Sequence, residues 1–260
     1  MKRTTRPSGT RRHTVSAVVL MLAAVTSSVA AADDGDGPLG VTVEADDDAR
    51  SARVGALFHS ADLDSDHFCT ASVVHSAGRD LILTAAHCLD GGGALFFVPG
   101  YRDGRAPYGV WEVGQTYVSD TWSGTRDEDS DLAFAAVGRL AGAGVEDVVG
   151  GNAFVTGRAT GSTAVTVTGY PKKADAPITC TNKPTAAAHS RTTHSRTTQQ
   201  RIECPGFPGG TSGSPWINGD GRLVGLIGGH EEGGSTADVS YSVVLGAEAA
   251  ALYRRAGGAA

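Results

Sequence analysis

The sequence is poor in methionine and aromatic residues, which limits the folds it can form. Its 260 residues include 2 Met, 3 Trp, 6 Tyr and 7 Phe, but 36 Gly. Glycine at about twice its average frequency indicates many turns. No long segment has the 3.6-residue hydrophobic period of a helix. We therefore exclude a helical bundle and a coiled coil.

Cysteine is also scarce. The chain has four cysteines, Cys69, Cys88, Cys180 and Cys204, too few for a disulfide-dense miniature scaffold. Four cysteines are enough for two disulfides in an oxidising compartment, and they allow three pairings. The residues alone leave the pairing open.

Long hydrophobic runs are absent. The apolar run at 15–25 has 11 residues, whereas a membrane-spanning helix needs about 20. Basic residues precede this run and small residues follow it, an order typical of a signal peptide. Residues 1–30 are therefore predicted to be a cleaved signal, which makes the protein secreted and extracellular with no membrane anchor. The pair Arg11 and Arg12 leaves both general and twin-arginine export open.

The predicted mature chain lacks an excess of positive charge. Without residues 1–30 it has 17 Lys and Arg against 28 Asp and Glu, a formal charge of −11. A charge of this sign disfavours nucleic acid and anionic membranes as partners. Residues 31–52 are rich in Asp and are predicted to be a solvated acidic leader or pro-segment outside the core.

From residue 53 onward, short apolar runs alternate with Gly, Asp, Ser and Pro. Seven runs have the length and the β-branched or aliphatic content of strands: 54–58, 70–74, 81–84, 95–98, 132–137, 164–168 and 223–227. Only 247–255 has the pattern of a helix. Many short strands with frequent turns predict an all-β fold, a barrel or a sandwich.

One internal duplication stands out. The sequence His-Ser-Arg-Thr-Thr at 189–193 is repeated at once at 194–198. Two copies are too few for a solenoid, so we interpret them as a local duplication in an exposed loop that runs into a strand at 199–203. Its histidines have no carboxylate or cysteine partners at metal-binding spacing, which disfavours a metal site there.

Three segments contain residues suited to nucleophilic chemistry. His87 directly follows an apolar strand, and Asp131 lies between a polar loop and an apolar strand. Ser212 lies in the turn Gly-Gly-Thr-Ser-Gly-Ser-Pro, where backbone N–H groups can converge on an incoming oxygen. Each segment alone has an ordinary structural explanation, but together they supply a nucleophile, a base and an orienting acid.

The order of these residues and the motifs around them resemble one family. The chain order His87, Asp131, Ser212 differs from the orders of subtilisins and α/β-hydrolases. With Thr-Ala-Ala-His-Cys at 84–88 and Gly-Thr-Ser-Gly-Ser-Pro at 210–215, the sequence resembles the chymotrypsin/trypsin-fold serine peptidases, especially their secreted bacterial branch.

The resemblance implies a fold and a set of roles. It implies that residues 53–260 form a peptidase domain of two six-stranded antiparallel β-barrels with a short C-terminal helix, and that the active site lies between the barrels. Ser212 would be the nucleophile, His87 the general base and acid, and Asp131 the residue that orients His87. The backbone N–H groups of Gly210 and Ser212 would form the oxyanion hole. The implied enzyme is a monomeric endopeptidase that acts on polypeptides and needs no cofactor or metal.

The resemblance also selects a disulfide pairing, Cys69 with Cys88 and Cys180 with Cys204.

Two residues depart from the pattern of the digestive enzymes. Thr211 stands where those enzymes have an Asp that pairs with the new N-terminus, so this loop needs other contacts. Ser214 stands where the commoner motif has Gly. Bacterial relatives share the serine at this position.

The substrate pocket is implied to lie near Gly206 and Phe207 and along Gly228, Gly229 and His230. No acid stands at Gly206, which disfavours a preference for Arg or Lys. We expect a small or apolar preference, with His230 as a loop residue. The alternative function is a catalytically silent relative that binds a partner through the cleft, but no member of the triad is lost.

Overall fold

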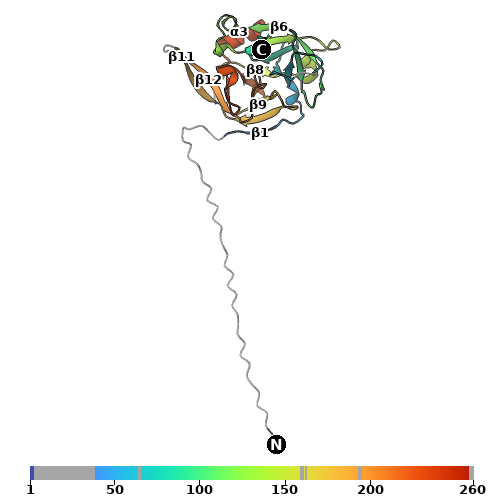
Figure 1. Ribbon diagram of the computed structural model, residues 1–260, viewed down its shortest axis with the longest axis vertical. Helices are drawn as coiled ribbons and strands as arrows, with labels where there is room; N and C mark the ends of the chain where they lie inside the picture. The colour runs from blue at the N-terminus through green and yellow to red at the C-terminus, as the bar shows by residue number, and fades with distance from the viewer. Residues whose placement is uncertain (3–38, 64–65, 159–160, 162, 193–194, 258–260) are drawn as a thin grey trace. The chain divides into compact units, whose positions relative to one another are not determined.

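The computed structural model describes Met1, Lys2 and residues 39–63, 66–158, 161, 163–192 and 195–257, without the side chains of 189–198. The chain divides into Met1–Asp36 and Gly37–Ala260. The predicted signal peptide lies outside the described residues, apart from its first two. All elements reported below belong to the second unit (Figure 1).

The first half of this unit is a closed antiparallel barrel. Its strands are β2 (Val54–Phe58), β3 (Cys69–Val73), β4 (Leu81–Thr84), β5 (Phe96–Pro99), β6 (Trp111–Val118) and β7 (Ala133–Val137). They pair in the order β2-β3-β4-β7-β6-β5, and β2 pairs with β5 to close the barrel. All residues of β2, β3 and β4 are buried, which explains why these strands are short apolar runs in the sequence.

The second half consists of two sheets. A six-stranded sheet has the order β1-β10-β9-β13-β14-β8 and contains β1 (Val41–Glu44), β8 (Ala153–Phe154), β9 (Val165–Gly169), β10 (Ile178–Asn182), β13 (Pro215–Asn218) and β14 (Arg222–Leu226). A three-stranded sheet has the order β11-β12-β15 and contains β11 (Thr185–Thr192), β12 (Ser195–Glu203) and β15 (Val239–Ser242). The two described strands β14 and β8 pair in parallel, over a short stretch.

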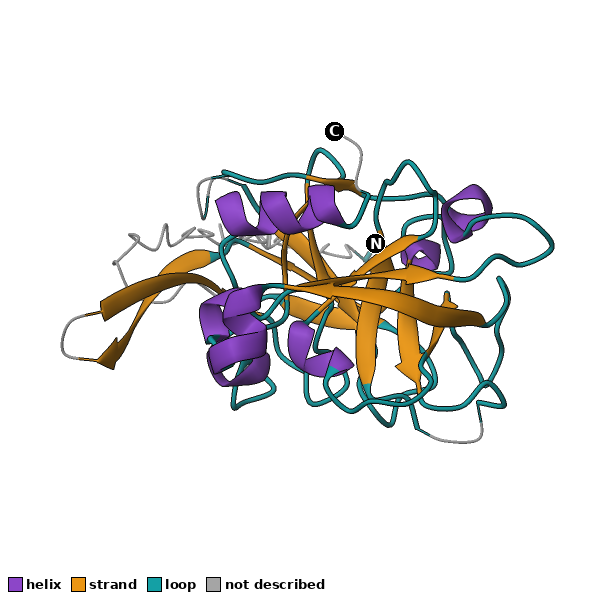
Figure 2. Cartoon of the chain, turned by 90° about the horizontal axis from the view of Figure 1, so that it is seen from above, coloured by secondary structure: helices purple, strands orange, loops and turns teal. Residues whose placement is uncertain are grey.

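This arrangement confirms the all-β class but differs in detail from a second closed six-stranded barrel. Strand β12 pairs with β11 on one edge and with β15 on the other. Both of its edges are therefore occupied, and it forms no backbone ladder with the larger sheet in the described strands. The β11–β12 hairpin projects from the body of the fold (Figures 1 and 2). The duplicated segment was expected in an exposed loop, but 189–192 lie in β11 and 195–198 in β12; its side chains lie outside the described residues.

Helices are few and short (Figure 2). They are α1 (Asp120–Thr125), α2 (Val145–Val149) and α3 (Ala247–Arg255), with 3₁₀ turns η1 (Ser51–Arg53), η2 (Ala86–Leu89), η3 (Glu128–Ser130) and η4 (His230–Gly233). The C-terminal helix α3 has the bounds that the sequence predicts. It packs against β6 and β7 of the barrel and buries Ala249, Leu252 and Tyr253.

The residues predicted to form a leader differ from that expectation in their second half. Val41–Glu44 form β1 and pair with β10 over four residues, with Thr42 opposite Cys180. Ala45, Ser51 and Ala52 are buried. The acidic composition of 31–52 conceals this strand because the Asp residues flank it, whereas the strand itself contains Val41 and Val43, which lie on an edge and are 77% and 54% exposed. The folded unit therefore begins before residue 53.

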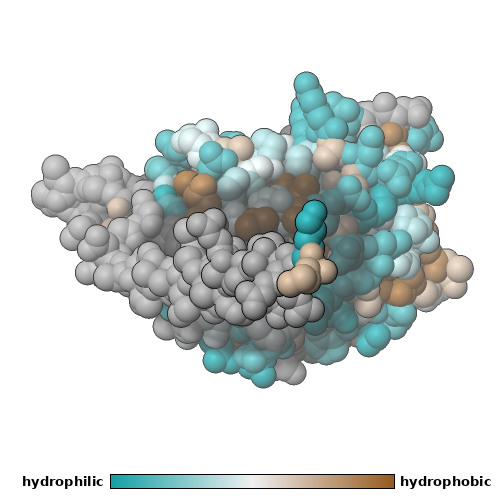
Figure 3. All heavy atoms as spheres, turned by 90° about the horizontal axis from the view of Figure 1, so that it is seen from below, coloured by the Kyte–Doolittle hydropathy of each residue, from teal (hydrophilic) through white to brown (hydrophobic). Residues whose placement is uncertain are grey.

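The buried apolar residues form one large cluster and smaller ones. The largest cluster fills the first barrel and reaches α3, and a second lies under the six-stranded sheet around Trp216 and the Cys180–Cys204 disulfide. In β9, Val165 and Val167 are buried whereas the alternating Thr166 and Thr168 are only partly buried, so one face of that strand packs into this cluster. Hydrophilic residues cover most of the described surface in Figure 3, and hydrophobic residues gather there in a few patches.

A buried histidine joins the two halves of the fold. His67 is 3% exposed, and its ring meets the rings of Phe58, Tyr101 and Tyr170 edge-on. Its Nε2–H donates to the carbonyl oxygen of Ala174 at 3.0 Å, and its Nδ1 atom has no hydrogen-bond partner among the described residues. Burial lowers the pKa of His67, although the nearby carboxylates of Asp66 and Asp175 act in the opposite direction.

This lowered pKa predicts a pH dependence of stability. Below the unfolded-state pKa of about 6.5 the unfolded chain binds a proton that native His67 does not, so stability should fall as the pH drops from 7 to 5. We expect His67→Phe to make this fall smaller, by about 1.4 kcal/mol for each pKa unit of depression. Urea unfolding of both proteins at several pH values measures the difference. Equal slopes for the parent protein and His67→Phe would contradict the prediction.

Candidate active site

Strand pairing brings His87 and Asp131 together. His87 lies in η2 just after β4, and Asp131 lies just before β7. Strands β4 and β7 are antiparallel neighbours in which Thr84 lies opposite Ala133. The end of one strand is therefore next to the start of the other, and residues that follow or precede these ends must lie close together. The Nδ1 atom of His87 is 2.8 Å from Oδ2 of Asp131.

The carboxylate of Asp131 is completely buried and accepts hydrogen bonds from several donors. Besides the Nδ1–H of His87, it accepts the backbone N–H of His87 at 3.0 Å and that of Gly229 at 2.8 Å. Asp131 has no exposed surface, so these bonds replace the water that a buried carboxylate loses. Because Nδ1 carries the proton in this arrangement, neutral His87 presents Nε2 as a proton acceptor.

Ser212 lies in a tight turn that its neighbours hold in place. The Thr211 hydroxyl donates to the Pro208 carbonyl at 2.7 Å, and the Ser214 hydroxyl donates to the Thr211 carbonyl at 2.6 Å. Gly213, with φ +86°, donates its N–H to Ile227 at 2.7 Å. A Cβ atom at Gly213 would lie 2.0 Å from the Thr70 carbonyl oxygen, so only glycine fits this position.

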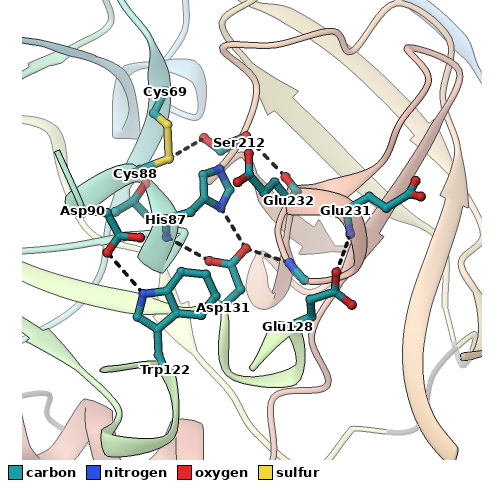
Figure 4. Close-up of polar contacts among 12 residues, drawn as sticks. Cys69, His87, Cys88, Asp90, Trp122, Glu128, Asp131, Ser212, Glu231 and Glu232 are labelled. Atoms are coloured by element: carbon teal, nitrogen blue, oxygen red, sulfur yellow. Dashed lines mark hydrogen bonds and ion pairs between the residues drawn. A yellow bond between two sulfur atoms is a disulfide. The ribbon is translucent and has the colours of Figure 1, made fainter. Parts of the chain in front are cut away.

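Thr70 connects this turn to the barrel. Its N–H donates to the Ser212 carbonyl at 2.8 Å, and its hydroxyl donates to the Gly210 carbonyl at 3.0 Å. The same hydroxyl accepts the Tyr170 N–H at 2.9 Å. The neighbouring Cys69 is bonded to Cys88, whose Sγ atom lies 3.8 Å from the Ser212 carbonyl oxygen. The disulfide therefore joins β3 to the segment of His87, and both of its ends lie beside the Ser212 turn through non-covalent contacts (Figure 4).

The two expected oxyanion-hole donors belong to this turn. Gly210 has φ +99°, and a Cβ atom there would lie 2.4 Å from the backbone nitrogen of Lys172. Within the described chain, the backbone N–H groups of Gly210 and Ser212 make no hydrogen bond. Both donors therefore remain available to a ligand.

The Ser212 hydroxyl donates to the backbone carbonyl of Glu232 at 3.4 Å (Figure 4). No hydrogen bond joins it to His87 in the described residues. Glu232 and Glu231 belong to η4 and have left-handed backbones, with φ +57° and +50°, which is unusual for residues other than glycine. The N–H of Glu231 donates to Oε1 of Glu128 at 3.2 Å, which helps to hold this turn over Ser212.

A cavity of about 550 Å³ lies beside His87. Four of the residues that line it are acidic: Asp90, Glu128, Glu231 and Glu232. Its one lining arginine among the described residues, Arg126, forms an ion pair with Asp90 and lies over the Trp122 ring at 5.2 Å. The remaining carboxylates give this cavity a negative character.

The residues expected in the substrate pocket do not all line this cavity. Gly229 lines the cavity with His87, and Gly228 lies against Asp131. His230 turns toward Glu128, with Nδ1 3.5 Å from Oε2. Phe207 is 4% exposed and packs in the core of the second half, and neither it nor Gly206 lines this cavity.

Sequence reasoning missed four residues of the cavity wall, Asp90, Trp122, Arg126 and Glu128. Three of them come from α1, the residue after it, and η3, which precede Asp131 in the chain. The polar run 126–131, which ends at Asp131, was the signal that could have indicated this wall of the cavity. Such a run is equally typical of a solvated turn.

Both disulfides expected from the resemblance are present, Cys69–Cys88 and Cys180–Cys204. Among the described residues, the one group with metal-ligand spacing is Cys69, His87 and Cys88. Its sulfur atoms are joined to each other and offer no thiolate to a metal. In the part of the chain that the structure describes, no helix has the length and apolar character to cross a membrane.

Comparison with known proteins adds independent evidence. The family model described as "Trypsin-like peptidase domain" matches residues 69–226. No curated protein matches the sequence. The solved structure of the protease Anisep from Arthrobacter nicotinovorans is similar at 26% identity and a TM-score of 0.69, covering 84% of this chain and 99% of that one.

Two further solved structures are similar. The thermostable serine protease AL20 from an extremophilic microorganism has 26% identity and a TM-score of 0.67, covering 81% of this chain and 99% of that one. A Glu endopeptidase, at 16% identity and a TM-score of 0.63, covers 85% of this chain and 98% of that one and supports the fold alone. The chain has the chymotrypsin-like fold and belongs to the trypsin-like peptidase domain family.

Proposed function

We propose that this protein is a secreted serine endopeptidase that cleaves polypeptides through an acyl-enzyme, with His87, Asp131 and Ser212 as its triad. The observation that carries the proposal is the buried Asp131 carboxylate, which accepts the Nδ1–H of His87 at 2.8 Å. Burying a carboxylate is costly, and here it fixes the imidazole tautomer that a general base requires.

In this mechanism Ser212 Oγ attacks the carbonyl carbon of the scissile peptide bond while its proton passes to Nε2 of His87. The negative oxygen that develops is stabilised by the free N–H groups of Gly210 and Ser212. His87 then gives the proton to the leaving amine, and the C–N bond breaks. A water molecule next attacks the acyl-enzyme, transfers its proton through His87, and restores Ser212.

The contact between Ser212 Oγ and the Glu232 carbonyl requires a rearrangement in this mechanism. A hydroxyl group has one proton, so Ser212 must leave the Glu232 carbonyl before it can donate to His87. Rotation about the serine side-chain bond needs no backbone change. Catalytic hydrogen bonds also often shorten only when substrate binds.

Secretion is proposed from two features. The first 30 residues have the basic, apolar and small-residue order of a signal peptide. The two disulfides require an oxidising compartment for their formation. The proposed enzyme is a monomer that uses no cofactor. We place the start of its folded domain before Val41, because β1 is part of the larger sheet.

The first test is covalent labelling. An assembled triad makes Ser212 react with a fluorophosphonate, so the exported protein should gain the mass of one phosphonyl group on Ser212. The Ser212→Ala variant should gain none, and intact-mass and peptide mass spectrometry measure both. A folded, disulfide-bonded protein that takes no label would refute the proposed catalysis and favour a silent relative that binds through the cleft.

Replacing Asp131 by its amide tests whether its carboxylate orients the catalytic base. Asp131→Asn keeps the size of the side chain but places an amide where the Nδ1–H of His87 now donates, which favours the wrong tautomer. We expect kcat for a peptide ester to fall by about 10⁴-fold, as in serine peptidases generally. Stopped-flow or steady-state assays give kcat. A loss below tenfold would show that Asp131 does not orient the catalytic base.

The bonds of Thr70 lead to a third prediction. Thr211 offers no charge for an ion pair, and we propose that Thr70 fixes the Ser212 turn instead, as a positioning residue. Thr70→Val removes the donor to Gly210 and leaves the buried Tyr170 N–H unsatisfied, at a cost of about 1–3 kcal/mol in stability. Displacement of the oxyanion donors should lower kcat by about tenfold or more, with a smaller change in KM.

Thr70→Ser is the matched control, because it keeps the hydroxyl. It should retain most of kcat and most of the stability measured by urea unfolding. If Thr70→Val lowers stability but leaves kcat unchanged, Thr70 supports the fold only and does not position the oxyanion donors.

A further inference from the structure

A second cavity, away from the triad residues in the chain, has the chemistry of an anion site. It has a volume of about 180 Å³ and lies between η1 and β2 of the first half and β9, β13 and the β13–β14 turn of the second. None of the residues that line it is acidic, whereas Arg50 and Arg53 both do so.

Two donors at this cavity are buried and unused. The Nδ2 group of Asn152 and the Nε–H of Arg53 have no hydrogen-bond partner among the described residues. Asn152 is 5% exposed, so water does not replace the missing partner freely. Buried donors are nearly always paired, and an unpaired one needs an explanation such as a ligand.

Asn218 supplies a third hydrogen-bond donor at this cavity. The Oδ1 atom of Asn218 accepts the backbone N–H groups of Asp220 and Arg222, at 3.1 and 3.0 Å. These bonds fix the orientation of the amide and leave its Nδ2 group as a donor. Asn218 is 8% exposed and lines the cavity. The polar lining therefore offers amide and guanidinium donors to a ligand that accepts hydrogen bonds.

Arg53 also has a fixed place in the wall. Gly150, with φ +78°, ends α2 next to it, and a Cβ atom at Gly150 would lie 3.1 Å from Arg53 Nε. The close approach of the backbone restricts the guanidinium. Within the described residues, Arg53 forms no ion pair with a carboxylate, whereas Arg50 interacts electrostatically with Asp48, which lies outside the cavity lining.

We propose that this cavity binds a small inorganic oxyanion of the phosphate or sulfate type, held by Arg50, Arg53, Asn152 and Asn218. Planar guanidinium groups match the oxygen geometry of such ions. Because the donors come from both halves of the fold, the bound anion would hold the halves together and stabilise the native state. This inference does not depend on the proposed peptidase activity.

The test uses the exported Ser212→Ala protein, so that self-digestion cannot interfere. Thermal unfolding is followed as phosphate replaces chloride at constant ionic strength, and calorimetry measures the number of phosphate ions bound. We expect saturable binding at one site, with the midpoint temperature rising by about 3 °C or more at saturating phosphate. Sulfate should compete for the same site.

Two site variants and one control make the test specific. Arg53→Gln removes the positive charge and the guanidinium fork, and Asn152→Leu removes the amide donors at nearly constant volume. Each should abolish saturable binding. Arg105→Gln removes the same charge from an exposed turn outside the cavity and should respond like the parent. If Arg53→Gln fails to fold, Asn152→Leu and Arg50→Gln decide the question.

Some results would overturn the proposal. Phosphate ions stabilise most proteins weakly by exclusion from their surface, and that effect rises with concentration without saturation. A rise of this kind, equal in the parent, the site variants and Arg105→Gln, would mean that no site exists. Absence of calorimetric binding at millimolar phosphate would lead to the same conclusion.

Discussion

The antiparallel pairing of β4 with β7 is the constraint on which the candidate site depends. It places the end of one strand beside the start of the other, so that His87 and Asp131 meet although 44 positions separate them. The burial of Asp131 follows from this pairing, because its carboxylate lies under η2 and next to Gly229. The second half of the fold then supplies Ser212, whose turn is hydrogen-bonded to Thr70 of the first half, and the Cys69–Cys88 disulfide ties the strand of Thr70 to the segment of His87.

Strands that are buried on both faces could be predicted from the sequence. The bounds of β2 and β4 match the predicted 54–58 and 81–84, because each is a short continuous apolar run. Strands β6, β10 and β11 escaped prediction because they are rich in Thr, Gly or polar residues. Such strands are specified by their neighbours more than by their own composition.

The site also combines features that local sequence indicates with features that depend on tertiary contacts. The three motifs identified His87, Asp131 and Ser212 as candidate residues of the proposed triad. The resemblance to a family implied the pairing of the cysteines. The turn at 230–233 could not be predicted, because two consecutive glutamates in a left-handed conformation contradict local preference and persist only through tertiary contacts. The cavity around Arg53 and Asn152 likewise depends on contacts between residues about a hundred positions apart in the chain.

The edge strand β1 limits how far the chain can be trimmed from its N-terminal side. It is hydrogen-bonded to β10 from Val41 to Glu44, and β10 contains Cys180 of the second disulfide. Besides this ladder, β1 is held by the Thr42 hydroxyl, which donates to the Pro205 carbonyl, and by the ion pair of Glu44 with Arg102. A cut after Glu44 followed by loss of the strand would expose β10 as a new sheet edge, open to pairing with another chain. In the proposed enzyme, trimming that leaves the larger sheet intact must therefore stop before Val41.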